Sequence, residues 1–282
     1  MKYTRQIIFT MCVVILCGII FAGRVQNVSA VKSESAFKLP IIMYHQVSEK
    51  PKKLGKYVIS PAEFEHDVKL ALARGFTPIT VNDLIAHADG VKKLPPKPII
   101  FSFDDGCQSD YVYVFGIAKK YGIRIVSSPV GAYTEEYSGD VPRPVDYAHL
   151  STGEMREMQE SGLFEFQNHS YNMHNFDINR KGCLKRKGES EKSYDALIRA
   201  DFERAQKIFR DSGLPEPTCF TYPFGSTNET LLTHVKTFGF RASLGTYERV
   251  NVLTGAQDEL YDLKRFNRPH GMDIKKILSQ VE

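Results

Sequence analysis

Residues 98–106 read Pro-Ile-Ile-Phe-Ser-Phe-Asp-Asp-Gly, an apolar run that ends in two adjacent carboxylates and a glycine. A run of this length with almost no polar interruption is typical of a strand buried on both faces, as in a parallel sheet. We expect the strand to end at Phe103, so that Asp104, Asp105 and Gly106 begin the following loop. The two carboxylates point in different directions and can serve different roles, although an ordinary Asp-Gly turn would use the same residues.

Short apolar runs alternate with helical patterns along the rest of the chain. This alternation predicts a mainly parallel sheet, open or closed into a barrel. About seven such units in the 245 residues of 38–282 favour an α/β fold, a distorted (β/α) barrel with about seven strands. No linker rich in Pro, Gly or Ser divides this region, so we expect one domain. The expected strands are 39–44, 76–79, 98–103, 123–130, 164–166, 219–222, 241–244 and 261–266, and the expected helices are 61–74, 81–88, 112–121, 152–161, 194–212, 229–238 and 273–281.

The start of the first expected helix carries a strong local signal. Ser60 stands at the N-cap position, Pro61 at the first helical position and Glu63 three residues after the cap. This order predicts a capping box, in which the two side chains satisfy the first backbone N–H groups of the helix. Gly75 follows the apolar stripe and is expected to end the helix.

The composition excludes several classes of protein. Of the 282 residues, 42% are hydrophobic and 25% are charged, so a disordered or collagen-like chain is excluded. Without residues 1–30, 34 basic residues face 33 acidic ones, and no basic stripe indicates a nucleic-acid partner. The basic cluster at 180–187 precedes Glu189 and Glu191 and is interpreted as a solvated loop. Trp is absent, so an aromatic platform for a sugar must use Tyr or Phe.

The amino terminus has the pattern of an export signal or a membrane anchor. An uncharged apolar run of 16 residues, 7–22, follows Lys2 and Arg5, and 28–30 is a small-residue end typical of signal-peptide cleavage. The run is slightly shorter than the roughly 20 residues of a full bilayer span, and an uncleaved anchor is the alternative. Either way, we expect the remainder to be extracellular or on the outer face of the cytoplasmic membrane. The expected division is 1–30 signal or anchor, 31–37 tether and 38–282 folded domain.

The cysteines outside the apolar run indicate neither a disulfide framework nor a thiolate zinc site. Cys107, Cys183 and Cys219 are far apart, odd in number and without a C-x-x-C motif. We expect them to be small buried thiols.

Two histidines follow the expected strand 164–166, in a segment that reads Gln-Asn-His-Ser-Tyr-Asn-Met-His over 167–174. His169 and His174 are five residues apart, so they do not share one face of a regular helix, but they can converge in a loop. Imidazole is a preferred zinc ligand and a carboxylate is a common third. Other polar groups after expected strands are His45, the turn Pro223-Phe224-Gly225, Arg268 and His270, whereas His66, His87, His149 and His234 fall outside this set and are expected to be structural.

The residues after the strands therefore predict three metal ligands, a spare carboxylate and a spare histidine. Three protein ligands leave a coordination position open for water, as in catalytic zinc sites. A bound metal lowers the pKa of that water to about 7 and polarises a carbonyl group. A carboxylate that accepts the water's proton and an imidazole that donates one to the leaving group complete the apparatus for hydrolysing an amide or an ester.

Together these motifs resemble the polysaccharide deacetylases with a NodB homology domain, carbohydrate esterase family four, over about residues 38–272. Residues 101–106 resemble the family's first motif, T-F-D-D-G, which implies that Asp104 is the general base and Asp105 a metal ligand. Residues 169–174 resemble the second motif, which supplies two metal histidines, His169 and His174 here. The segment is one residue longer than the common H-[ST]-x-x-H and resembles the poly-N-acetylglucosamine deacetylase branch. The resemblance implies a NodB-like barrel.

The third motif is similar but incomplete. Tyr222-Pro-Phe-Gly225 resembles R-x-P-Y-G, in which the residue after Pro, Phe224 here, supplies a backbone N–H to the acetyl oxygen; we place Tyr222 and Phe224 among the substrate-binding residues. The motif's Arg, which orients the catalytic Asp in the family, is missing, and Phe220 or Thr221 stands near its place. Either another basic group replaces this Arg, or the orientation and basicity of Asp104 are less well controlled.

The general acid has two candidates. The family's common Leu-His pair near the C-terminus does not occur, but the exopolysaccharide branch uses a His after the first strand. Met-Tyr-His-Gln-Val at 43–47 resembles that feature and favours His45, with His270 as the alternative. Arg268 and His270 are also expected to bind substrate. The alternative for Arg268 is an ion pair with a carboxylate.

The resemblance implies a hydrolase of carbon–nitrogen bonds other than peptide bonds, a polysaccharide N-deacetylase. It would remove N-acetyl groups from an N-acetylglucosamine-containing polysaccharide or oligosaccharide of the cell envelope, peptidoglycan or exopolysaccharide. One divalent metal ion is implied, zinc by default, with cobalt or nickel also accepted. The alternatives are an exported carbohydrate-binding module with little or no catalysis and an O-acetyl esterase. Nucleic acid and protein partners are not expected, and membrane anchoring by 7–22 stays open.

Overall fold

The computed structural model of the chain describes residues 36–175 and 180–281. The predicted signal or anchor, 1–30, lies outside the described residues, as does most of the predicted tether. Within the described part, no helix is both long enough and apolar enough to cross a membrane. The tether prediction was wrong at its last residue, because Phe37 begins strand β1 (Phe37–Leu39), which pairs antiparallel with β11 (Asn251–Leu253). Sequence patterns could not show this pairing, since the partner strand lies near the other end of the chain.

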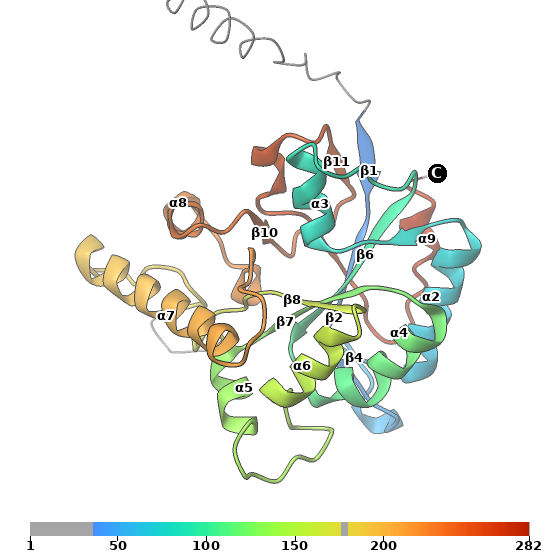
Figure 1. Cartoon of the computed structure of the whole chain (residues 1–282), viewed down its shortest axis with the longest axis horizontal. Coiled ribbons are helices and arrows are strands. Elements are labelled where there is room, and N and C mark those ends of the chain that lie inside the picture. Colours follow the sequence, from blue (N-terminus) through green and yellow to red (C-terminus); the bar gives the residue numbers. More distant parts are fainter. Residues whose placement is uncertain (1–35, 176–179, 282) are drawn as a thin grey trace, which may run out of the picture. The chain divides into compact units, whose positions relative to one another are not determined.

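A parallel sheet forms the centre of the molecule, and Figure 1 shows the helices around its outside. Its main strands follow the order β12-β2-β6-β7-β8, and the short strand β5 pairs with the start of β6. All of these neighbours run parallel, as the alternation of strands and helices predicts. The strands are β12 (Phe266–Asn267), β2 (Ile41–Tyr44), β6 (Pro98–Asp105), β7 (Ile125–Pro129), β8 (Phe164–Phe166) and β5 (Thr77–Pro78).

Two further strands, β9 (Cys219–Thr221) and β10 (Ala242–Leu244), continue the order beyond β8. Isolated bridges join Asn168 to Phe220 and Leu244 to Leu263, so the path returns through Leu263 to β12 and β2. The α/β class is confirmed, and seven of the eight expected strand positions hold a strand. In the described part of the chain, single bridges take the place of regular strand pairing on both sides of the β9–β10 pair. The barrel is therefore distorted and not regularly closed.

The helices agree with the sequence patterns at most positions. Ser60 and Glu63 form the predicted capping box at the start of α2, and Gly122 ends α4 with a left-handed φ of 61°. Helix α5 was not predicted, and a π-helical turn, Asp110–Val114, precedes α4. The helices are α2 (Pro61–Ala73), α3 (Val81–Ala88), α4 (Phe115–Tyr121), α5 (Gly131–Tyr137), α6 (Thr152–Glu160), α7 (Glu191–Asp211), α8 (Glu229–Phe238) and α9 (Lys275–Leu278).

The C-terminal expectations were less accurate. The strand expected at 261–266 is reduced to the bridge at Leu263 and to β12, and the helix expected at 273–281 is the short α9. The segment before β12 forms a 3-10 turn, Gln257–Leu260, and carries Asp262 at a φ of 53°. Its apolar residues therefore reach the core from irregular backbone, which periodicity does not detect.

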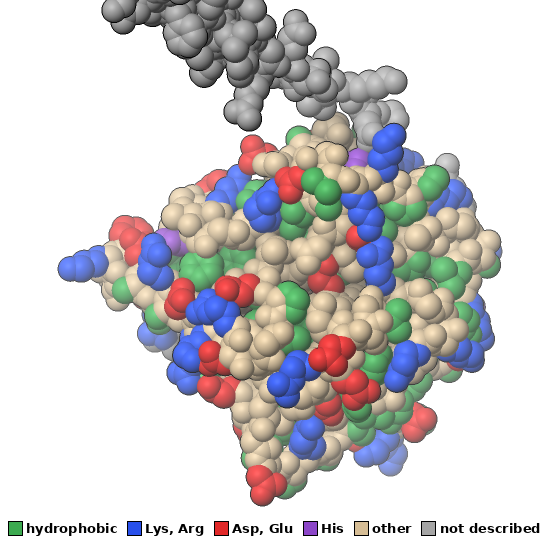
Figure 2. Space-filling view, in the orientation of Figure 1, with side chains coloured by type: hydrophobic (Ala, Val, Ile, Leu, Met, Phe, Trp, Pro, Cys, Tyr) green, Lys and Arg blue, Asp and Glu red, His purple; other side chains and the backbone are tan. Residues whose placement is uncertain are grey.

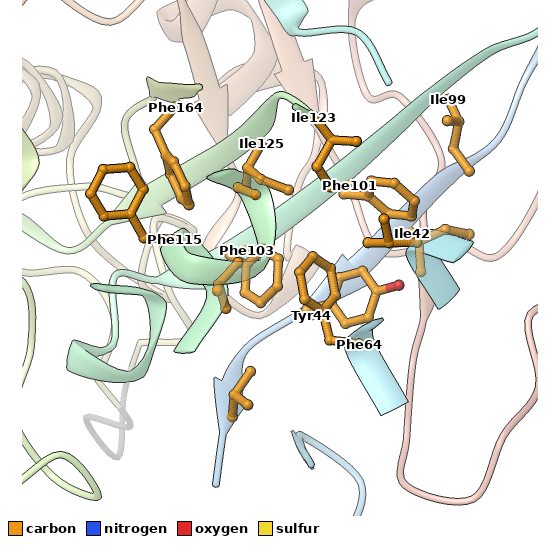
Figure 3. Close-up of a cluster of buried hydrophobic side chains, with 14 of the residues drawn as sticks. Ile42, Tyr44, Phe64, Ile99, Phe101, Phe103, Phe115, Ile123, Ile125 and Phe164 are labelled. Atoms are coloured by element: carbon orange, nitrogen blue, oxygen red, sulfur yellow. The ribbon is translucent and has the colours of Figure 1, made fainter. Parts of the chain in front are cut away.

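The alternation of side chains along β6 separates the core from the functional face. Phe101 and Phe103 point toward the helices and join a large buried cluster, drawn in Figure 3. The ring of Tyr44, from β2, stacks on Phe103 at 4.9 Å, and Phe64 of α2 meets the edge of Phe103 at 5.2 Å. Ser102, between the two Phe residues, lies on the opposite face of the strand. Dense aromatic packing thus fixes the ends of β2 and β6.

On the face shown in Figure 2, acidic and basic side chains are interspersed over the helices and loops. The basic cluster at 180–187 has acidic partners, since Arg180 donates to Glu189 and Lys185 pairs with Glu191. The reading of the cluster as a solvated loop was wrong at Arg180, whose side chain is buried in its ion pair, whereas Lys181 and Lys187 are exposed.

Replacement of Phe64 by Ala is expected to lower the free energy of unfolding by about 3–5 kcal/mol, because the deleted ring leaves a cavity in a close-packed cluster. The measurement is urea denaturation of the full-length protein in a mild detergent. Val112→Ala, at a side chain that is 47% exposed, serves as the control and is expected to change stability by no more than about 0.5 kcal/mol. Equal, small effects of both substitutions would contradict the assignment of this cluster as core.

Candidate active site

The carboxyl end of β6 sends its two carboxylates to different places. Asp104 is the last inward-facing residue of the strand, whereas Asp105 has a left-handed φ of 70°. Gly106 follows with a φ of 64°, and a Cβ at this position would lie 2.5 Å from the Cβ of Pro129. The chain therefore turns sharply at the strand end, and only glycine fits the second position of the turn.

Asp105 meets both histidines of the 167–174 segment. The Oδ1 atom of Asp105 lies 3.5 Å from the Nε2 atom of His169 and 3.3 Å from the Nε2 atom of His174. One ligand atom from each of the three residues lies within 4.8 Å of the others. Asp105 Oδ1 is buried and has no hydrogen-bond partner among the described residues, as expected of an atom whose partner is a cation. The three predicted metal ligands thus converge.

A hydrogen bond prepares His169 for this role. Its Nδ1–H donates to the backbone carbonyl of Thr221 at 2.8 Å, which leaves the lone pair of Nε2 directed toward Asp105. The ring is almost fully buried, whereas the side chains of Asp105 and His174 are 21% and 22% exposed. The centre is therefore anchored on the protein side and open on the other.

The loop between the two histidines is held by an acidic residue from α7. Both carboxylate oxygens of Asp201 accept backbone N–H groups, from Tyr171 and Asn172, each at 2.8 Å. Burial raises the pKa of Asp201 to about 6, although the two N–H groups act in the opposite direction. Ser170 takes a left-handed φ of 67°, so the chain reverses and brings His174 back toward Asp105. Sequence reasoning did not single out Asp201.

Asp104 forms a buried ion pair with Arg265. Both guanidinium NH groups donate to the carboxylate, at 2.6 and 2.8 Å, and the Nε–H group of Arg265 donates to the carbonyl of Gly245 at 2.7 Å. Burial acts to raise the pKa of Asp104, but the charge and hydrogen bonds of Arg265 together with the charges of His169 and His45 outweigh it, and the pKa lies below its usual value. Asp104 is therefore ionised at neutral pH. Arg265 thus provides a basic partner for Asp104 although the Arg of the third motif is missing, and the sequence did not single it out, because Asp262 and Lys264 in the same stretch are also charged.

His45 lies beside the acidic pair. It follows β2 directly, and its ring centroid is 4.7 Å from that of Tyr57. Burial lowers its pKa, while the charges of Asp104 and Asp105 act in the opposite direction. Its Nδ1 atom is buried without a hydrogen-bond partner in the described part of the chain. The structure thus brings this candidate acid to the two carboxylates.

The other candidate acid lies in a separate acidic cluster. His270 is half exposed, and its Nδ1 atom is 2.9 Å from a carboxylate oxygen of Glu63. Arg268 is buried beside it and donates through Nε to Asp67 at 2.7 Å. The prediction that Arg268 binds substrate was wrong. Its guanidinium is enclosed by the carboxylates of Glu63 and Asp67, and a carboxylate partner was the alternative interpretation of this residue.

The turn after β9 brings one of its two predicted residues next to the triad. Phe224 has a left-handed φ of 58°, and its ring lies 4.4 Å from that of His174. Tyr222 was predicted to bind substrate, but its side chain is buried against Phe220 in the core, so that prediction was wrong. Tyr222 lies two residues after Phe220, and residues two apart on a strand face the same side, so the Tyr222 ring joins Phe220 in the core.

His149 was expected outside the site, and that expectation was wrong about its position. It bridges to Cys107, two residues after Asp105, and its ring lies 4.4 Å from that of Tyr133. The Tyr133 hydroxyl donates to the backbone carbonyl of His174 at 3.4 Å. His149 thus packs behind the second histidine of the triad.

The family of the chain follows from its sequence. A family profile described as polysaccharide deacetylase matches residues 91–243, a region that holds both carboxylates and both histidines of the site. The chain belongs to the polysaccharide deacetylase family. His45 and Arg265 lie outside the matched region.

Curated relatives of this deacetylase-family chain are named poly-beta-1,6-N-acetyl-D-glucosamine N-deacetylase. One, from Staphylococcus aureus strain MRSA252, is 24% identical over 198 residues, 70% of this chain and 64% of the relative. Another, from Escherichia coli strain K12, is 27% identical over 186 residues, 59% of this chain and 27% of the relative. The matches therefore span less than two thirds of these relatives' length.

Solved structures share the fold. A de-N-acetylase from Aggregatibacter actinomycetemcomitans superposes with a TM-score of 0.73 at 20% identity, over 86% of this chain and 99% of that one. IcaB from Ammonifex degensii superposes with a TM-score of 0.67 at 22% identity, over 88% and 96% of the two chains. The predicted NodB-like fold is confirmed.

The protein is expected to bind one divalent metal ion per chain, and Asp105→Ala is expected to weaken zinc binding by at least about 100-fold, since loss of mere supporting contacts already costs 10–100-fold. Isothermal titration of the metal-stripped protein with zinc is the measurement. Asp146→Asn, which alters a carboxylate paired with Lys50, serves as the control. Tight, stoichiometric binding by the Asp105 variant would contradict the assignment of the triad.

Arg265→Gln is expected to lower the free energy of unfolding at pH 7 by about 3–5 kcal/mol, because it leaves Asp104 charged and unpaired in the interior. Since Arg265 lowers the pKa of Asp104, the pair stabilises the fold above the unfolded carboxyl pKa of about 3.9, and this contribution is lost as the pH falls through the folded pKa. The difference from wild type should therefore shrink toward pH 3.

Urea unfolding at pH 7 and pH 3.5 measures both quantities. Arg204→Gln, which removes an exposed partner of Glu135, is the matched control and is expected to have little effect. An Arg265 variant no less stable than this control would refute a stabilising pair.

Proposed function

We propose that this chain is a metal-dependent N-deacetylase that hydrolyses acetamido groups of a β-1,6-linked N-acetylglucosamine polysaccharide outside the cytoplasmic membrane. The observation that carries the proposal is the meeting of the Asp105–His169–His174 triad with the Asp104–Arg265 pair at the ends of β6 and β8. The names of the curated relatives favour the exopolysaccharide over peptidoglycan. The export pattern of residues 7–22 supports the location.

The triad fits a divalent metal ion through its donor chemistry. Two imidazole nitrogens and one carboxylate oxygen are a set that zinc accepts, and cobalt and nickel also bind such sets. The buried Oδ1 atom of Asp105, which lacks a partner among the described residues, supports a cation at this place. When bound, the ion would polarise the acetamide carbonyl and make a water molecule more acidic.

Asp104 would act as the general base. Its carboxylate is ionised and held in one orientation by the two hydrogen bonds from Arg265. A carboxylate has about four lone-pair sites, so the bidentate contact leaves positions that can accept a proton from the attacking water. Arg265 thus lowers the basicity of the Asp104 carboxylate but fixes its orientation and keeps it ionised. Phe224, next to His174, is the residue whose backbone N–H we assign to the acetyl oxygen.

His45 would protonate the departing sugar amine. An amine is a poor leaving group, and transfer of a proton to its nitrogen lowers the barrier to cleavage of the C–N bond. The donating form of His45 is the imidazolium, which the charges of Asp104 and Asp105 favour, although burial lowers the pKa of the ring. After cleavage, the proton that Asp104 took from the water returns to His45, and the products, acetic acid and the free amine, ionise to acetate and the ammonium form.

The competing functions lose part of their support. The missing Arg of the third motif favoured a carbohydrate-binding module without catalysis. Arg265 supplies a guanidinium contact to Asp104, which removes this argument. An O-acetyl esterase would use the same base but needs less help at the leaving group. His45→Ala would then reduce activity on an amide much more than activity on an ester.

The full-length protein is expected to release acetate from β-1,6-linked N-acetylglucosamine oligomers, and chelation should abolish the release until zinc is restored. Asp104→Asn and His45→Ala are each expected to reduce kcat by about 10²–10⁴-fold, the usual contribution of a general base or acid. Asp146→Asn is the control. Release that survives both chelation and Asp105→Ala would refute the metal mechanism, and absence of release by a zinc-loaded protein would refute the function.

A further inference from the structure

The turn Pro223–Gly225 contains the peptide group whose N–H we assign to the acetyl oxygen. That N–H belongs to Phe224, and the carbonyl of the same peptide group belongs to Pro223. A trans peptide group is planar, so its C=O and N–H point in opposite directions and cannot turn independently. No cis peptide bond occurs in the described residues. Whatever fixes the Pro223 carbonyl therefore also fixes the direction of the Phe224 N–H.

One hydrogen bond and one packing contact hold the Pro223 carbonyl. Its oxygen accepts the N–H of Ser226 at 3.1 Å, within the turn itself. Gly182, a buried residue of the segment between β8 and α7, packs on the same carbonyl. A Cβ atom on Gly182 would lie 2.8 Å from the Pro223 oxygen, whereas ordinary contacts begin at 3.4 Å. Only glycine therefore allows this backbone to lie so close to the peptide group.

The backbone on both sides of Gly182 is anchored. The carbonyl of Cys183, which is fully buried, accepts the hydroxyl of Tyr194 from α7 at 2.7 Å. Arg180 donates to the carbonyl of Leu184 at 2.8 Å. The contact between Gly182 and the turn is thus maintained by groups that belong to the folded domain.

The turn is also packed at its third residue. Gly225 has a left-handed φ of 62°, and a Cβ atom there would lie 1.8 Å from the Oγ1 atom of Thr246. A displacement of Pro223 therefore cannot be absorbed by a closer approach of Gly225 to Thr246. Phe224, between them, has a left-handed φ of 58°, a conformation that persists where the surroundings determine it.

We propose that Gly182 is a positioning residue for deacetylation, because its contact with the Pro223 carbonyl directs the Phe224 N–H toward the oxyanion that forms when water attacks. The proposal rests on the proposed function through the role of Phe224. Such an N–H stabilises the transition state more than the bound substrate, since the negative charge develops during the attack. Misdirection of the N–H should therefore lower kcat and leave KM unchanged.

Steady-state release of acetate from a β-1,6-linked N-acetylglucosamine pentamer by the zinc-loaded full-length protein tests the proposal. Gly182→Ala is expected to lower kcat by about 10–100-fold at unchanged KM, because a misplacement of about 1 Å can cost 10²-fold. Gly188→Ala is the matched control. Gly188 also has a left-handed φ, 79°, but nothing lies within 4 Å of its Cβ position, so its kinetics should equal those of wild type.

A milder pair of variants covers the case in which Gly182→Ala does not fold. Tyr194→Phe removes the hydrogen bond to the Cys183 carbonyl and is expected to lower kcat by about 3–10-fold at unchanged KM, the effect of one lost hydrogen bond. Tyr261→Phe is its control, because it removes a similar hydrogen bond, to the carbonyl of Phe240 at 2.9 Å, at the edge of the same buried cluster. This control should retain the wild-type kcat.

A transition-state analogue distinguishes positioning from a general loss of structure. A glucosamine dimer that carries a methylphosphonamidate in place of the acetamide presents a tetrahedral anion to the turn. Its affinity for Gly182→Ala should fall in parallel with kcat, whereas zinc affinity, measured by titration, should equal that of wild type.

Unchanged kcat in both Gly182→Ala and Tyr194→Phe would overturn the proposal. A loss of zinc binding or a rise in KM that accounts for the whole effect would also overturn it. Acetate release by wild type with either of these results would retain the proposed function. Absence of release by zinc-loaded wild type would refute the function, and the proposed role of Gly182 with it.

Discussion

The buried ion pair between Asp104 and Arg265 is the interaction on which the rest of the site depends. Its two hydrogen bonds, at 2.6 and 2.8 Å, join the end of β6 to the irregular segment before β12. Charges withdrawn from water are costly unless geometry and partners are nearly complete, and here Arg265 also donates to Gly245 and to Ser102. The pair therefore fixes both the charge state of the proposed base and the position of the last strand beside β2.

The second constraint is the backbone at the strand ends. In the described residues, the non-glycine positions with a left-handed φ are Asp105, Ser170, Phe224 and Asp262. Asp105 belongs to the triad, Ser170 follows His169, and Phe224 contacts His174. Such conformations cost free energy and persist where the surroundings determine them. Buried aromatic packing on the helix side of β6, together with the hydrogen bonds to Asp201 and Thr221, supplies that determination. Rigid strands and sharply turned ends thus place the ligands from two strands within reach of one ion.

The proposed chemistry divides the site into a charged centre and an aromatic margin. Asp104, Asp105 and the two histidines would handle the acetyl group, while His45 stands at the boundary with Tyr57.

The sequence by itself determined the α/β class, most helices and strands, the family, and the residue types that converge on the triad. Local signals suffice for these, because capping boxes, apolar runs and polar residues at strand ends each lie within a few neighbouring positions. The tertiary structure alone decided that Arg265 pairs with Asp104, that Arg268 belongs to Asp67 and that Tyr222 faces the core. It also brought His149 behind the triad and Tyr57 beside His45. Partners far apart along the chain meet only once the strands have closed around the centre, and no periodicity in the sequence encodes which of several arginines or tyrosines reaches it.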